Sequence, residues 1–223
     1  MEQNNWSGVE AAIFDLDGTL ADSLGVWEQV DRVFFERRGM ELPADYQRSV
    51  QEMGFSSAAA YTKRTYGLPQ SEKEIIAEWN GLVREEYARR IELKPGVPRY
   101  LRELKARGVR IGLATASGKG LYEPLLARHG VLPLFSACVS TDEVGKDKSS
   151  PDVYLACARR LCAAPRACVV FEDLLPALRA AKGAGMRTAA VLDRQTRAER
   201  AALAAEADTA FCTFAEAPAL RAR

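Results

Sequence analysis

Short apolar segments recur along this chain, and their length limits the structures that they can form. The clearest of them, residues 9–14 (VEAAIF), is too brief for a helix and ends directly before Asp15. An apolar run of this length without polar alternation is typical of a strand that is buried on both faces of a sheet. Similar runs are found at residues 109–114, 137–140, 167–171, 187–192 and 209–213.

Helical patterns separate these runs in the second half of the chain. They cover residues 97–107, 121–129, 152–161, 174–184 and 198–207. Strands that alternate with helices form parallel sheets with right-handed crossovers, and helices then cover both faces of the sheet. The expected fold class is therefore α/β, with a Rossmann-like parallel sheet whose ligand site lies at the carboxyl ends of the strands.

Residues 23–94 interrupt this alternation. Three or four helical patterns follow one another there without a convincing strand between them, including those at residues 26–38, 57–66 and 71–91. The chain has 223 residues, which is more than one typical domain and less than two. We therefore expect a core domain at residues 1–22 and 95–223, with a small all-helical domain inserted at residues 23–94.

Composition excludes several classes of function. The chain has 31 Lys and Arg against 30 Asp and Glu, so we expect no nucleic-acid partner, which would need a basic surface. Its single histidine, His129, precedes Gly130, a pattern typical of a helix end rather than of a catalytic site. The five cysteines lack the spacing of a disulfide framework or a zinc site. Because no apolar stretch approaches the roughly 18 residues of a membrane span, we expect a cytoplasmic chain without a membrane partner.

Two acidic residues follow the first apolar run, in the sequence Asp15-Leu16-Asp17-Gly18. Residues two apart in extended backbone face the same side, so both carboxylates are expected to point into one site. Such a pair can serve as a nucleophile, as an acid–base pair or as metal ligands. A calcium loop is excluded, because the twelfth position of that motif needs a glutamate and is occupied here by Val26.

Three further strand ends supply groups that suit a phosphate ligand. They are Thr115, Ala116 and Ser117 after residues 109–114, Lys148 in the loop after residues 137–140, and Glu172 and Asp173 after residues 167–171. A hydroxyl and backbone N–H groups can bind one phosphate oxygen, and an ammonium group can neutralise another. We therefore expect a phosphate site with two pairs of carboxylates at one edge of the sheet.

This ordered set of motifs resembles the haloacid dehalogenase superfamily, in particular the phosphotransferase branch that includes β-phosphoglucomutase-like phosphatases and carries a helical cap after the first motif. The resemblance covers residues 9–213, and its first motif, DLDGTL, is highly specific. It implies that Asp15 is the nucleophile and that Asp17 is the general acid–base. Dehalogenases of the superfamily lack the second acid, because a carbon–halogen bond needs no protonated leaving oxygen, so Asp17 favours phosphate esters.

The resemblance also assigns the other motifs. Thr115 and Lys148 match the second and third motifs, and Glu172 and Asp173 match the acidic fourth motif that holds Mg2+. The implied metal ligands are Asp15, Asp17 through its main-chain carbonyl, Glu172 and Asp173. These are oxygen donors, which Mg2+ prefers in proteins.

The implied function is a Mg2+-dependent phosphatase that hydrolyses a small phosphorylated metabolite through an aspartyl-phosphate. A sugar phosphomutase and a non-catalytic module that binds phosphorylated ligands are the alternatives. β-Phosphoglucomutases have a histidine and a cap arginine where this chain has Trp27 and Ser57, which disfavours the mutase. Gly54, three residues before Ser57, is a further candidate substrate-binding residue. As for assembly, we expect a monomer or a weak homodimer.

Two motifs depart from the family pattern. The third usually reads Lys-Pro-x-Pro-Asp, whereas Ser149 follows Lys148 here. In the fourth, Leu174 and Ala177 replace a small polar residue and a glycine. Neither change removes a reacting group. We expect both to alter loop rigidity and the hydrogen bonds around the site.

Overall fold

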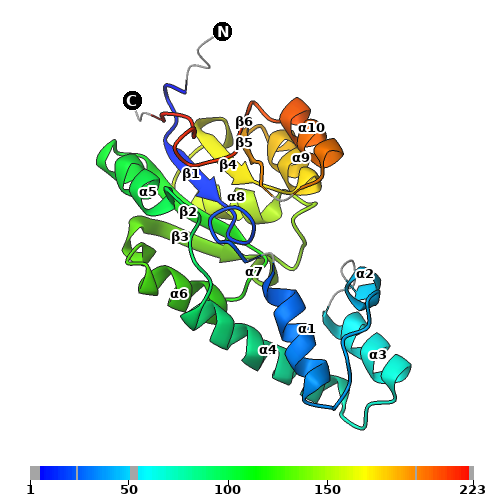
Figure 1. Cartoon of the computed structure of the whole chain (residues 1–223). Helices are drawn as coiled ribbons and strands as arrows, with labels where there is room; N and C mark the ends of the chain where they lie inside the picture. Colours follow the sequence, from blue (N-terminus) through cyan, green and yellow to red (C-terminus); the bar gives the residue numbers. More distant parts are fainter. Residues whose placement is uncertain (1–5, 24, 51–54, 194, 221–223) are drawn as a thin grey trace. The chain divides into compact units, whose positions relative to one another are not determined.

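All six apolar runs form strands in the computed structural model, which describes residues 6–23, 25–50, 55–193 and 195–220 except for the side chains of residues 48 and 55. The strands are β1 (Ala11–Phe14), β2 (Arg110–Thr115), β3 (Phe135–Ser140), β4 (Cys168–Glu172), β5 (Arg187–Val191) and β6 (Thr209–Phe211). Neighbouring strands are parallel, in the order β3-β2-β1-β4-β5-β6 (Figure 1). The Rossmann-like α/β fold expected from the sequence is confirmed.

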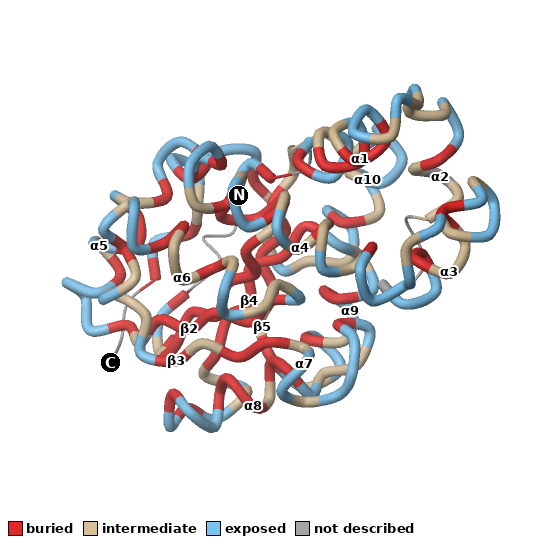
Figure 2. Tube along the Cα trace, turned by 90° about the horizontal axis from the view of Figure 1, so that it is seen from below, coloured by how far each residue is buried: buried red, intermediate tan, exposed pale blue. Residues whose placement is uncertain are grey.

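Helices connect the strands and cover both faces of the sheet. They are α5 (Val97–Ala106), α6 (Lys119–Arg128), α7 (Thr141–Val144), α8 (Asp152–Arg160), α9 (Leu175–Gly183) and α10 (Arg197–Glu206), with the short 3-10 helices η1 (Leu132–Leu134) and η2 (Pro165–Ala167). Helices α8 and α9 pack on the face that carries Ile13 and Val170. On the other face, Phe14 stacks on Phe171 with ring centroids 4.4 Å apart, and Tyr100 of α5 packs edge-on against both rings. Strands β1, β2, β4 and β5 are consequently buried along most of their length, as Figure 2 shows for β2, β4 and β5.

Element boundaries differ from the sequence-based expectations at the two strand ends that matter for function. Strand β2 continues through Thr115 and strand β4 through Glu172, so both residues are held in the sheet rather than in the loops after it. Helix α7 was not expected, and it begins at a capping box in which the backbone N–H of Ser140 donates to Glu143. His129 occupies the C-cap position of α6, as predicted.

The helical segment consists of α1 (Val26–Glu36), α2 (Tyr46–Val50), α3 (Phe55–Tyr66) and α4 (Glu72–Arg89). Helix α4 matches the helical pattern predicted at residues 71–91 and begins at a capping box on Ser71, whereas the short helix α2 was not predicted. Aromatic contacts join these helices, since the Phe35 ring lies 4.9 Å from the rings of both Tyr46 and Tyr66. Among the described residues, none of the helices is both long and apolar enough to span a membrane.

Contacts divide the chain into two compact units, Met1–Ser23 with Glu92–Arg223 and Leu24–Ile91. The second boundary falls three residues before the expected end of the insert at Lys94. The reason is that the returning chain bonds to the outgoing one within the larger unit. The N–H of Asp22 donates to the Glu92 carbonyl at 2.9 Å, and the N–H of Lys94 donates to the Leu20 carbonyl at 2.8 Å.

Close packing of α8 against the sheet depends on Gly112 of β2. A Cβ at this position would lie 2.5 Å from Sγ of Cys157 and 2.8 Å from Cδ1 of Leu161. We expect Gly112→Ala to lower the free energy of unfolding by about 1 to 3 kcal/mol, because added atoms in a packed core displace their neighbours. Equilibrium unfolding in urea measures this change.

Gly81→Ala is a control of the opposite sign. Gly81 is an exposed residue of α4, and a Cβ there would meet nothing within 4 Å. Replacing glycine by alanine inside a helix stabilises it by roughly 0.5 to 1 kcal/mol. Similar effects of the two substitutions would contradict the close approach of α8 at Gly112.

Candidate active site

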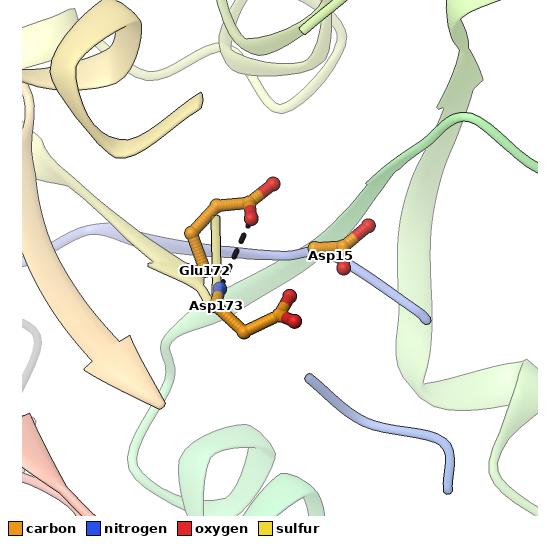
Figure 3. Close-up of side chains that lie close together, drawn as sticks. All are labelled: Asp15, Glu172 and Asp173. Atoms are coloured by element: carbon orange, nitrogen blue, oxygen red, sulfur yellow. Dashed lines mark hydrogen bonds between the residues drawn. The ribbon is translucent and has the colours of Figure 1, made fainter. Parts of the chain in front are cut away.

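Three carboxylates meet at the carboxyl ends of the two central strands. Asp15 follows β1, Glu172 is the last residue of β4, and Asp173 comes directly after it (Figure 3). One carboxylate oxygen from each residue lies within 4.8 Å of the other two. Strands β1 and β4 are also neighbours at the point where the strand order reverses, which is the usual ligand site of such sheets.

These carboxylates are almost completely removed from solvent. The exposed fraction is 3% for Asp15, 0% for Glu172 and 3% for Asp173. Burial raises the pKa of Asp15 well above its usual value, and the neighbouring carboxylates Glu172 and Asp173 add to this effect although Lys148 opposes it. Burial and the Glu172 charge likewise raise the pKa of Asp173 to about 7. Full ionisation of the three carboxylates is therefore unfavourable without further positive charge, which a bound divalent cation would supply.

Lys148 enters the same site from the loop that follows α7. Its ammonium group donates to Oδ1 of Asp15 and to Oε1 of Glu172. Although burial lowers the pKa of Lys148, these two carboxylates outweigh burial and hold the pKa above its usual value. The lysine is therefore charged at neutral pH, next to the residue expected to be the nucleophile.

Asp17 occupies a separate position beside this cluster. Its carboxylate accepts hydrogen bonds from the hydroxyls of Ser23 and Ser117, at 2.7 Å each. Asp17 is half-buried, and its charge contributes to the raised pKa of Asp15. The first motif thus supplies two carboxylates in different surroundings, one among charged groups and one held by hydroxyls.

The second motif is arranged differently from our expectation. Thr115 is fully buried, and its Oγ1 accepts a hydrogen bond from the N–H of Ser117 at 2.9 Å. The Ser117 N–H, which we expected to face a phosphate, is therefore used within the loop. Ala116 is exposed between them, and the Ser117 hydroxyl is directed to Asp17.

The turn of the first motif fits closely around Asp173. Gly18 has a φ of +84°, and a Cβ at this position would lie 2.9 Å from Cγ of Asp173. The hydroxyl of Thr19 donates to Oδ1 of Asp173 at 3.0 Å. Glycine at position 18 is thus required twice, for its backbone conformation and for the room that it leaves to this carboxylate.

Sequence reasoning missed a second buried lysine. The Lys94 ammonium group donates to the Gly18 carbonyl and lies 3.0 Å from the carboxylate of Asp193. Gln195, which follows β5 like Asp193, also contacts the site, because its Nε2 donates to the Asp173 carbonyl at 3.3 Å. No motif marks these residues, and in the sequence Lys94 is one more charged residue at the end of the expected insert.

Tyr154 of α8 was missed as well. Its hydroxyl donates to Oε1 of Glu172 at 2.7 Å, inside the core. A tyrosine in an apolar helical pattern looks like an ordinary packing residue, so only the structure reveals this contact.

Departures from the family motifs have local structural counterparts. Ser149 replaces a proline, and its backbone N–H donates to Oδ1 of Asp147 at 2.9 Å, which constrains the loop before the site. Ala177 is buried in α9, whereas Leu174 is exposed. The candidate substrate residue Gly54 lies outside the described residues.

Fold and site together define a hydrolase of the type in which an aspartate after the first strand faces a lysine and an acidic pair. A family model described as haloacid dehalogenase-like hydrolase matches residues 9–185. The chain belongs to this family.

Individual relatives agree with this assignment. The bifunctional riboflavin kinase/FMN phosphatase of Arabidopsis thaliana is 35% identical over 82% of this chain, which spans about half (49%) of that protein's length. Hexitol phosphatase B of Escherichia coli is 29% identical over 81% of this chain and 82% of its own. The crystal structure of CbbY from Rhodobacter sphaeroides in complex with phosphate is 29% identical, with a TM-score of 0.78 over 93% of this chain and 96% of that one.

The contacts of Lys94 lead to a stability prediction. We expect Lys94→Met to lower the free energy of unfolding by about 1 to 3 kcal/mol, because the Gly18 carbonyl and Asp193 lose a buried partner. The pKa of Asp173 should rise further, since Lys94 holds it down. Urea unfolding and carboxyl NMR titration of the metal-free protein measure the two effects.

Lys105→Met is the control, because Lys105 is an exposed lysine of α5. It should leave both the stability and the Asp173 titration nearly unchanged. If the two variants behave alike, Lys94 does not support the turn at Gly18.

Proposed function

We propose that this chain is a Mg2+-dependent phosphatase that hydrolyses a small phosphorylated metabolite through an aspartyl-phosphate intermediate. The observation that carries the proposal is the buried Asp15 held between the Lys148 ammonium and the Asp173 carboxylate. Membership of the hydrolase family supports it, as do two relatives whose names contain phosphatase activities.

The metal would be held by Asp15 and Asp173, with the main-chain carbonyl of Asp17 as a further oxygen and Glu172 as a remaining candidate. The donor set suits Mg2+, because it consists of carboxylate and carbonyl oxygen atoms. When bound, the cation would neutralise charge on the phosphoryl group and so reduce its repulsion of a carboxylate nucleophile.

The chain's own residues divide the chemistry between them. Asp15 attacks phosphorus in line with the ester oxygen, forming an acyl-phosphate bond as the P–O bond to the leaving group breaks. Asp17 gives its proton to the departing oxygen. In the second step Asp17 takes a proton from water, whose oxygen attacks phosphorus and releases phosphate and the Asp15 carboxylate.

Lys148 and the second-motif threonine serve the phosphoryl group rather than the proton transfers. The charged Lys148 neutralises a phosphoryl oxygen in the transition state, where a positioned cation has its largest effect. Thr115 donates its hydroxyl hydrogen to another phosphoryl oxygen. The Ser117 N–H bonds to a lone pair of the same Oγ1 and does not use this hydrogen. The unit Leu24–Ile91 is assigned the role of a cap that excludes water and selects the leaving group.

Asp15→Asn tests the nucleophile. We expect wild-type protein with Mg2+ to release phosphate from p-nitrophenyl phosphate and from one or more members of a phosphometabolite panel. Asp15→Asn and removal of the metal with EDTA should each abolish turnover, because the amide cannot form the acyl-phosphate and the phosphoryl charge is no longer neutralised. Asp142→Asn, at an exposed residue of α7, is the matched control and should retain full activity.

Other outcomes identify the alternatives. Conversion of one sugar phosphate isomer into another without phosphate release would favour the mutase. Equal inertness of wild type and Asp15→Asn, with phosphate-ester binding retained, would favour a non-catalytic module.

Asp17→Asn tests the acid–base step through the leaving group. p-Nitrophenolate leaves without protonation, so this variant should still release about one nitrophenolate per chain in a rapid burst, followed by slow turnover because hydrolysis of the intermediate lacks its base. A sugar phosphate needs protonation in the first step, and its turnover should fall by roughly 100- to 10,000-fold without a burst. Steady turnover of both substrates at the wild-type rate would exclude the acid–base role.

A further inference from the structure

The hydroxyl of Tyr154 is a buried polar group that the mechanism above does not use. The residue lies on α8 and has no exposed surface, and its hydroxyl donates to Oε1 of Glu172 at 2.7 Å. An ionised carboxylate oxygen can only accept, so the Tyr154 hydroxyl is the donor in this buried bond.

Glu172 accepts hydrogen bonds at both of its oxygens. Oε1 receives the Tyr154 hydroxyl and the Lys148 ammonium group. Oε2 receives the backbone N–H groups of Asp173 and Leu174, at 3.1 and 3.3 Å. An ionised carboxylate has about four acceptor positions, so these four donors occupy its whole capacity.

This arrangement separates Glu172 from the other two carboxylates of the cluster. A metal ligand needs a free lone pair directed at the cation, and Glu172 would have to give up one of four buried donors to provide it. The side chains of Asp15 and Asp173 have fewer donors among the described residues. The Asp15 carboxylate accepts from Lys148, and the Asp173 carboxylate accepts from Thr19.

Lys148 is the group that this arrangement orients. Its ammonium lies between Oδ1 of Asp15 and Oε1 of Glu172, so the position of Glu172 determines where the lysine charge is held. The two backbone N–H groups fix one oxygen of Glu172, and without a second donor the other oxygen would be fixed by the flexible lysine alone. The Tyr154 hydroxyl is that second donor.

We propose that Tyr154 is a positioning residue: by holding Glu172, it directs Lys148 at the nucleophile Asp15 and keeps the Glu172 carboxylate out of the metal's ligand set. The inference rests on the proposed phosphatase function, because it gives a purpose to the placement of Lys148. It also revises the sequence-based assignment of Glu172 as a metal ligand and leaves the carboxylates of Asp15 and Asp173 in that role.

Tyr154→Phe tests the proposal against the control Tyr100→Phe. Tyr100 is also buried in the core, and its hydroxyl donates at 2.8 Å to the carbonyl of Pro218, a bond that does not involve the site. Each variant removes one buried hydroxyl and keeps the ring, so we expect similar small decreases in melting temperature. The measurements are kcat and KM for a phosphomonoester, the inhibition constant of inorganic phosphate, and Mg2+ affinity by calorimetry on the metal-free protein.

We expect Tyr154→Phe to lower kcat roughly tenfold, the effect of losing one hydrogen bond to a buried charged group, and to weaken inhibition by phosphate severalfold. Its Mg2+ affinity should stay within about twofold of wild type, since no ligand is lost. Tyr100→Phe should match wild type in all three measurements.

Three results would overturn the proposal while leaving the phosphatase function intact. They are wild-type kinetics for Tyr154→Phe, equal kinetic losses in both variants, and a change in Mg2+ affinity large enough to account for the loss in kcat. A wild-type protein with neither turnover nor affinity for phosphate would instead overturn the proposed function and, with it, the role of Tyr154.

Discussion

The ion pairs of Lys148 with Asp15 and Glu172 are the interaction on which the rest of the site depends. Charges removed from water are tolerated only when partners and hydrogen bonds replace the solvent, and here one ammonium group faces three buried carboxylates. Burial and mutual repulsion consequently raise the pKa values of Asp15 and Asp173. An arrangement of this kind favours binding partners that bring positive charge with them, and a phosphate ester accompanied by a divalent cation satisfies both signs at once.

Position in the sheet explains why these groups meet. Strands β1 and β4 are far apart in sequence and adjacent in space, so residues that follow them share one end of the sheet. The core on both faces of these strands is densely packed, and Gly112 allows α8 to approach closely. The same helix carries Tyr154 beneath the site. Packing and active-site geometry are thus set by the same contacts, which ties the placement of the charges to the rigidity of the core.

Local sequence patterns predicted the strands and the residues that follow them, because an apolar run and a strand-end acid are readable without knowledge of neighbours. Asp15, Asp17 and Asp173 were predicted as site residues in this way and Lys148 from the loop after the third run, and their roles stay predictions. Lys94 and Tyr154 were not, since their roles come from partners more than fifteen residues away in sequence, Gly18 and Glu172. The orientation of the Ser117 N–H toward Thr115 was also missed, because it depends on a side-chain hydrogen bond that residue type alone does not specify.

The paired linkers between the two units have a consequence for how proteins of this type can diversify. Backbone hydrogen bonds between Asp22 and Glu92 and between Leu20 and Lys94 close the larger unit at the two ends of the insert. With respect to the sheet, the insert is equivalent to a very long loop whose two ends are joined by these backbone hydrogen bonds. Its length and sequence can therefore change over evolutionary time without altering the spacing of the residues at the strand ends. Under the cap role proposed above, such changes would alter the choice of substrate and leave the reaction unchanged.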